Sequence, residues 1–125
     1  MPRLMRLFAL RGAITVEHND AHRIIDATEA LLQEILERNG LRPDDVVSCI
    51  FTSTEDLNAE FPAVAARQLG FEHVPLLCAR ELDVPGAMRR VIRVLLHYHA
   101  DEGHRAQHVY LGEAQALRQD LGAAQ

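Results

Sequence analysis

Arg93 is the residue of this sequence that most invites a chemical role, because it interrupts the apolar run at 91–96. A cation inside an apolar strand is costly unless an anionic group pairs with it. Glu81, Glu55 and Asp56 are the acidic residues that we consider as internal partners. The alternative is an arginine that points to water from a half-exposed strand, which is the more common situation for this residue type.

Three further arginines and one tyrosine could join Arg93 in a site for an anion. They are Arg11 beside a glycine, Arg67 in a short helical segment, Arg118 near the C-terminus, and Tyr110. All 13 basic residues are arginines, whose planar guanidinium suits bidentate binding of carboxylates. Spacing alone does not bring these residues together, and an ordinary surface or packed position is the alternative for each of them.

Metal and nucleophilic chemistry have weaker support. The seven histidines show no HExxH or Cys/His spacing of a zinc site, although His97 and His99 share a strand face. There is no GxSxG elbow and no glycine-rich phosphate loop. Cys78 acting with a histidine in a small hydrolase or deaminase stays open as a rival, although an inert buried thiol is the commoner case. We therefore expect neither a metal nor another cofactor.

Length and charge narrow the class of protein. A chain of 125 residues has room for one domain, which we place at 1–125. The net charge of −5 argues against binding to nucleic acid, which requires a basic face. Cys49 and Cys78 give no disulfide framework, and the N-terminal apolar stretch is too short for a secretory signal or a membrane span. These features predict a cytoplasmic protein that binds neither nucleic acid nor membrane.

Periodicity and turn residues predict an α+β fold with one mixed five-stranded sheet and two helices. Asp20 and Gly40 bound an amphipathic helix over 21–38, and Pro62 opens a shorter helix that ends near Leu69. The predicted strands are 4–16, 46–52, 73–78, 89–99 and 108–111, with helix as the alternative for 89–99. Residues 118–125 lack apolar content and are predicted to form a flexible tail.

Six segments resemble, in order, the motifs of the small chorismate mutases of the Bacillus type, the AroH class. They are RGAITVE (11–17), TEDLNAEFPA (54–63), VPLLCARE (74–81), VIRV (91–94), HVYL (108–111) and LRQDL (117–121). This ordered series is far more specific than any single motif. Two departures are Val64, where relatives carry a charged residue, and Gln119, which interrupts the tail motif in place of a proline.

The resemblance implies conversion of chorismate to prephenate, a pericyclic rearrangement that requires no nucleophile, metal or cofactor. Arg93 would stabilise negative charge on the breaking ether oxygen. Arg11 and Tyr110 would hold the side-chain carboxylate of the substrate, and Glu81 would meet its ring hydroxyl. The other implied contacts are Cys78 at the same hydroxyl, Phe61, Ala63 and Leu77 in the pocket wall, Arg67 near the ring carboxylate, and Leu117 and Arg118 in a tail that closes the site.

The resemblance also implies a homotrimer in which three sheets pack as a pseudo-α/β-barrel, with active sites between subunits. The alternative is a trimer of the same fold that binds a dicarboxylate metabolite without catalysis. A carboxylate such as Glu81 beside an anionic ligand is useful mainly where positive charge develops, which favours the enzyme.

Overall fold

The computed structural model describes residues 4–120, and side chains as far as residue 117. Within that range five strands and two α-helices make up most of the fold. The elements are β1 (Met5–Thr15), α1 (Ala21–Asn39), η1 (Pro43–Asp45), β2 (Val46–Ser53), α2 (Ala63–Gln68), β3 (Leu76–Arg80), β4 (Val91–Asp101), β5 (Val109–Leu111) and η2 (Gly112–Asp120), where η denotes a 3₁₀ helix. The predicted five-stranded sheet with few helices is therefore confirmed.

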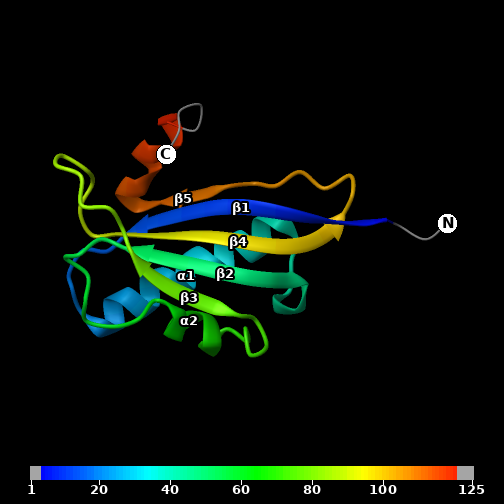
Figure 1. Cartoon of the computed structure of the whole chain (residues 1–125), viewed down its shortest axis with the longest axis horizontal. Helices are drawn as coiled ribbons and strands as arrows, with labels where there is room; N and C mark the ends of the chain where they lie inside the picture. Colours follow the sequence, from blue (N-terminus) through cyan, green and yellow to red (C-terminus); the bar gives the residue numbers. More distant parts are fainter. Residues whose placement is uncertain (1–3, 121–125) are drawn as a thin grey trace.

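The strands form one mixed sheet in the order β3-β2-β4-β1-β5 (Figure 1). β4 lies at the centre, antiparallel to both β1 and β2, whereas the shorter edge strands β3 and β5 run parallel to β2 and β1. The segment for which helix was the alternative is thus a strand, and it carries Arg93. Its Val, Ile and Leu residues favour this state because such side chains pack well on a pleated surface.

α1 is bounded by the residues that the sequence indicates. The Asp20 carboxylate accepts hydrogen bonds from the backbone N–H groups of His22 (2.8 Å) and Arg23 (3.4 Å), which have no partner within the helix. Gly40 ends the helix with φ of 61°, a left-handed conformation that glycine adopts at little cost. The predicted helix is confirmed, one residue longer at its C-terminus. Its buried apolar stripe contains Ile24, Leu31, Leu32 and Ile35.

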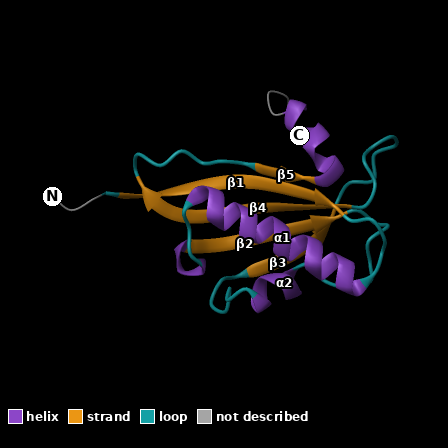
Figure 2. Cartoon of the chain, turned by 180° about the vertical axis from the view of Figure 1, so that it is seen from behind, coloured by secondary structure: helices purple, strands orange, loops and turns teal. Residues whose placement is uncertain are grey.

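Both helices cover the same face of the sheet, as Figure 2 shows. Strand side chains that point to this face form the main core, among them Leu10, Phe51, Ile92, Val94 and Leu96. Gly12 allows α1 to approach β1 closely, because a Cβ atom there would lie 2.9 Å from Ile35 Cδ1. Since side chains alternate along a strand, the neighbouring Arg11 and the central Arg93 point to the opposite face.

That opposite face, which we call the open face, is turned toward the viewer in Figure 1. Near β5 it carries a small buried cluster to which η2 contributes: Ala13, Val91, Tyr110 and Ala114. Elsewhere it exposes large apolar side chains, namely Met5 (58%), Leu7 (52%), Leu77 (60%) and Leu95 (37%). One face of the sheet is therefore closed by helices, and much of the other is available to solvent or a partner.

Two differences from the sequence expectation go beyond shifts of one or two residues at the ends of elements. β3 runs from Leu76 to Arg80 rather than over 73–78. Pro75 has no amide proton to donate, so the regular ladder begins only at Leu76. The Pro75 carbonyl still accepts the Cys49 N–H at 3.1 Å. The second difference is η2, which was not predicted. The tail predicted over 118–125 begins inside η2, and residues 121–125 lie outside the described residues.

Candidate functional site

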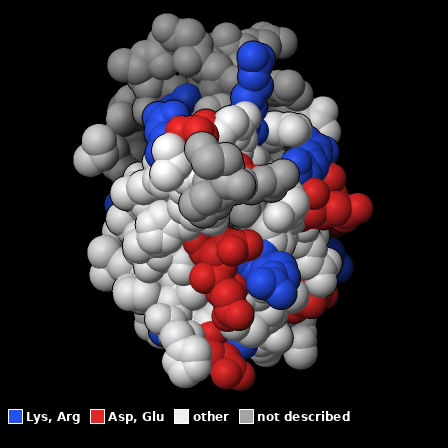
Figure 3. Space-filling model, turned by 90° about the vertical axis from the view of Figure 1, so that its right-hand side faces the viewer, with Lys and Arg blue, Asp and Glu red and all other residues white. Residues whose placement is uncertain are grey.

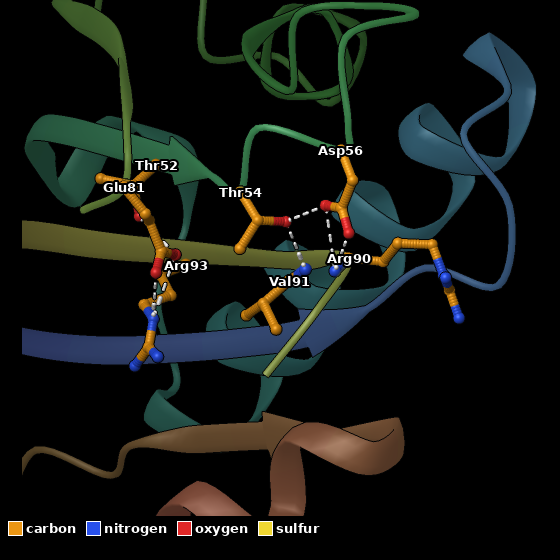
Figure 4. A network of polar contacts seen from close by, with 7 residues as sticks. All are labelled: Thr52, Thr54, Asp56, Glu81, Arg90, Val91 and Arg93. Atoms are coloured by element: carbon orange, nitrogen blue, oxygen red, sulfur yellow. Dashed lines mark hydrogen bonds and ion pairs between the residues drawn. The ribbon is translucent and has the colours of Figure 1, made fainter. Parts of the chain in front are cut away.

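Arg93 and Glu81 form an ion pair on the open face (Figure 4). Arg93 Nε donates to both carboxylate oxygens of Glu81 at 3.1 Å, and Thr52 Oγ1 donates to Glu81 Oε2 at 3.0 Å. The side chains of Arg93 and Glu81 are 32% and 16% exposed, so water screens their charges only in part. Arg93 is thus paired with Glu81, and the alternative of a purely solvated arginine is wrong.

The order of the strands explains why these three residues meet. Thr52 on β2 and Arg93 on β4 are register partners, so their side chains are adjacent on the open face. Glu81 directly follows β3, where its backbone N–H donates to the Ser53 carbonyl at 3.1 Å. Because β2 lies between β3 and β4, Glu81 reaches across Thr52 to Arg93.

A cavity of about 580 Å³ opens beside the ion pair. Its lining includes the four residues to which the family resemblance gives the central roles: Arg11, Glu81, Arg93 and Tyr110. Arg11 is placed there by its pairing with Leu95 across β1 and β4, and Tyr110 by its pairing with Ala13 across β5 and β1. Thr52 and the exposed Arg80 also line the cavity, and neither was expected there from the sequence.

Asp56 and Thr54 hold the turn that leads into β4 (Figure 4). Each carboxylate oxygen of Asp56 accepts the Arg90 N–H at 3.1 Å, while Thr54 Oγ1 donates to Asp56 and accepts the Val91 N–H at 3.1 Å. Arg90 has φ of 51°, an uncommon conformation for a residue with a side chain. Asp56 is therefore not the partner of Arg93 that the sequence allowed. It fixes the backbone just before Arg93 instead.

His108 supports Arg11 through the backbone. The Arg11 N–H donates to His108 Nδ1 at 2.9 Å, so the neutral ring carries its proton on Nε2. Burial, and then the positive charge of Arg11, lower the pKa of His108 below its ordinary value. Sequence reasoning missed this contact, since a histidine next to a short strand gives no signal of its partner.

The remaining predicted contacts lie outside this cavity in a single chain. Phe61 and Cys78 line a separate hollow of about 340 Å³, whose described lining contains no histidine to support the thiol–histidine rival. Cys78 packs against the core on the helix side, and Ala63, at the start of α2, does the same. Leu77 points to the open face and is largely exposed. The structure of one chain therefore does not join these four residues to Arg93.

Arg67 and Leu117 also have other neighbours in the single chain. Arg67 Nη1 donates to the backbone carbonyls of Phe71, Glu72 and Val74, which braces the turn after α2. Leu117 packs against the cluster that contains Tyr110. The backbone of Arg118 belongs to η2, but its side chain lies outside the described residues.

Other kinds of site find little support in the part of the chain that is described. There, no three or more His, Cys, Asp or Glu side chains are grouped to hold a metal ion. No helix between residues 4 and 120 is long and apolar enough to cross a membrane. Figure 3 shows arginines interspersed with acidic side chains at the end of the molecule where β1 begins, rather than a continuous basic surface.

The cavity beside Arg93 combines groups suited to a small dianion. Guanidinium and phenol groups bind carboxylates, and a fixed cation next to a carboxylate can stabilise two charges of opposite sign that develop in one reacting molecule. Chemistry of this kind needs preorganised charge rather than a nucleophile.

Comparison with known proteins agrees with this chemistry. The family described as "Chorismate mutase type I" matches residues 7–121. The chain is 52% identical to "Chorismate mutase AroH" of Thermus thermophilus over 93% of this chain and 97% of the relative. It is 40% identical to the protein of the same name from Bacillus subtilis (strain 168), over 94% of each chain. A solved chorismate mutase from Clostridium thermocellum superimposes with a TM-score of 0.83 at 45% identity, covering 87% of this chain and 98% of the other. Since the family match spans most of its length, this chain belongs to the type I chorismate mutase family.

Proposed function

We propose that this chorismate mutase binds chorismate in the cavity beside Arg93, selects its reactive conformer and stabilises the charge that develops during rearrangement to prephenate. Membership of the family supplies the reaction, an isomerisation in the biosynthesis of aromatic amino acids. The observation that carries the proposed mechanism is the Arg93–Glu81 pair, which shares one cavity with Arg11 and Tyr110.

The reaction itself explains why such a site suffices. A carbon–oxygen bond breaks while a carbon–carbon bond forms within one molecule, so no atom or proton has to come from the protein. The barrier falls when the two carbon ends are held close together. In the transition state the ether oxygen gains negative charge and the ring gains positive character. Fixed charges of opposite sign therefore bind it more tightly than they bind the substrate.

Five of the lining residues then have a role. Arg93 faces the ether oxygen, and Glu81 holds its guanidinium through Nε while favouring positive charge on the ring. Thr52 keeps the Glu81 carboxylate in place by its hydrogen bond of 3.0 Å. Arg11 and Tyr110 bind the side-chain carboxylate. The groups are preorganised because four of the five are attached to sheet strands, and Glu81 directly follows β3.

The active unit in this proposal is a homotrimer with each site between subunits. Large apolar side chains on the open face support it, because a neighbouring subunit would remove them from water. A second subunit would also complete the site with the contacts that lie elsewhere in one chain: Phe61, Ala63, Arg67, Leu77 and Cys78. Leu117 and Arg118 would close it. The free cysteines Cys49 and Cys78 support a cytoplasmic location.

Assembly is tested with Leu7→Glu, which places a charge on the exposed apolar part of the open face, away from Arg93. We expect sedimentation to show loss of trimer and the assay to show loss of activity together. A monomer with full activity would refute the shared site.

Catalysis is tested with Arg93→Ala beside the parent enzyme, following chorismate by ultraviolet absorbance with a chelator present. We expect kcat/KM to fall by about a thousandfold or more, since one preorganised donor to developing charge has this order of effect. Arg38→Ala, in the exposed ion pair with Glu34 on α1, is the matched control and should keep parental activity. If the parent binds chorismate but does not convert it, the chain is a dicarboxylate-binding protein instead.

A further inference from the structure

We infer that His108 is a positioning residue for Arg11: its unprotonated Nδ1 holds the Arg11 backbone so that the guanidinium stays in the substrate cavity. The inference deepens the proposed function, since it rests on Arg11 binding a carboxylate of chorismate. It assigns a role to a side chain that does not itself line the cavity.

The contact between Arg11 and His108 lies where the pairing of β1 with β5 begins. The parallel ladder between β1 and β5 starts at the pair Gly12 and Val109, so β5 offers no backbone carbonyl at the level of Arg11. The Arg11 N–H points to this edge and donates to His108 Nδ1 at 2.9 Å. The imidazole nitrogen thus replaces the missing carbonyl and prolongs the ladder by one hydrogen bond, at the residue that carries the cation.

Only a neutral His108 ring can accept the hydrogen bond from the Arg11 N–H. Protonation at Nδ1 would set two N–H groups against each other and would place a second positive charge beside the Arg11 guanidinium. Burial and the charge of Arg11 lower the pKa of His108 below its ordinary value of about 6.5. At neutral pH the ring therefore stays uncharged, and the contact persists.

A charged side chain and an uncharged amide lie near the His108 ring or its backbone. From β1 the ionisable group whose charge acts on His108 is Arg11. From α1 the uncharged Asn39 amide accepts the Gln107 N–H at 2.8 Å and donates to the Gln107 carbonyl at 3.0 Å. Asn39 thereby fixes the backbone of the residue before His108.

Two substitutions separate the acceptor from the titration. His108→Asn puts a carbonyl oxygen near the position of Nδ1, and it cannot be protonated near neutrality. His108→Leu has similar bulk but no acceptor. We expect KM for chorismate to rise about tenfold in His108→Leu, the effect of one lost hydrogen bond, with kcat changed much less. His108→Asn should keep KM near the parental value. His22→Asn, an exposed histidine on α1, is the control for the change in residue type.

The pH profile is a further readout that a purely structural role would not move. The parental KM should be constant from about pH 7 to 9 and should rise as the pH falls through the lowered pKa of His108. In His108→Asn the acidic rise should disappear. The proposal is overturned if His108→Leu keeps the parental KM, or if His108→Asn is impaired as much as His108→Leu.

NMR of the substrate-free enzyme tests the contact independently of the assigned reaction. The His108 ring should titrate below pH 6.5, and the Arg11 amide resonance should move with the same midpoint. A ring that titrates at or above its ordinary value, or an Arg11 amide that does not respond, overturns the positioning role. Arg11→Ala with an unchanged KM would instead show that the assignment of Arg11 to chorismate is wrong.

Discussion

The two faces of the sheet are built from alternate residues of the same strands, yet they differ in almost every property. On the helix side, Phe51, Ile92 and Leu96 are fully buried against α1 and α2. On the open face, the residues next to them in sequence include Thr52 and Arg93, which face the cavity. A strand period of two thus separates the side chains that stabilise the fold from those that hold charge.

Charged side chains are tolerated on the open face because they keep partial contact with water there. Arg93 is on the central strand and Glu81 directly follows an edge strand, but neither lies in the main core, so their desolvation is only partial. The helix side is accordingly mainly apolar, although α1 also buries Thr28 and Asn39 there. We expect substitutions on the helix side to change mainly stability, and substitutions on the cavity side to change mainly activity.

Phe51→Ala should have the largest effect on stability. Its ring is fully buried, and its loss removes apolar burial and leaves a cavity, at a cost of about 3–5 kcal/mol. Chemical denaturation measures this, with Val47→Ala on the exposed side of the same strand as the control. A cost below about 1 kcal/mol for Phe51→Ala would mean that the helix side does not carry the fold.

Glu81→Gln should have the next largest effect, on activity rather than on stability. It keeps the size of the side chain but removes the negative charge, so we expect kcat/KM to fall about a hundredfold, or about 2.7 kcal/mol, with little change in Tm. Glu55→Gln, an exposed acidic residue in the loop after β2, is the matched control. Unchanged activity in Glu81→Gln would show that its charge plays no part in the reaction.

Gly12→Ala should have an intermediate effect on stability, because a side chain at this position would point to α1. The new methyl group would come within 2.9 Å of Ile35 Cδ1 and 3.1 Å of Val94 Cγ1, and such overpacking costs about 1–3 kcal/mol. Gly103→Ala is the control, since a Cβ there meets nothing within 4 Å. Equal melting temperatures for both variants would contradict close packing of α1 on β1.

Arg38→Ala should have the smallest effect. Arg38 and Glu34 form an ion pair one helical turn apart on α1 at 2.8 Å, but both side chains are more than a third exposed. Pairs of this kind contribute about 0.3–0.5 kcal/mol, and less at high salt. Denaturation at low and high salt measures the difference, and a cost well above 1 kcal/mol would show a structural role outside the two faces.

Local patterns predicted those parts of the fold that depend on neighbours in sequence. α1 was predicted almost to the residue because Asp20 and Gly40 terminate it by local contacts. The order of the strands could not be predicted, since it depends on contacts between distant segments. The start of β3 was misplaced because Pro75 belongs to the approach to the strand and not to its regular ladder.

The site was predicted from the sequence in the same uneven way. Arg93 drew attention because a cation in an apolar strand requires a partner, and the resemblance to a family suggested Glu81. Thr52 and His108 gave no signal, because a threonine or histidine near a strand is ordinary. Only the register of β2 with β4 and the start of β5 beside β1 reveal what they contact.

The unequal lengths of the strands also have a consequence for motion. β4 has ladder partners on both sides over most of its length, whereas β5 has three residues and one partner. The backbone amide protons of β4 around Arg93 should therefore exchange with solvent only when the whole domain unfolds. Those of β5 around Tyr110 should exchange through local opening. Of the two walls of the proposed substrate cavity, the one formed by β4 should therefore be the more rigid and the one formed by β5 the more mobile.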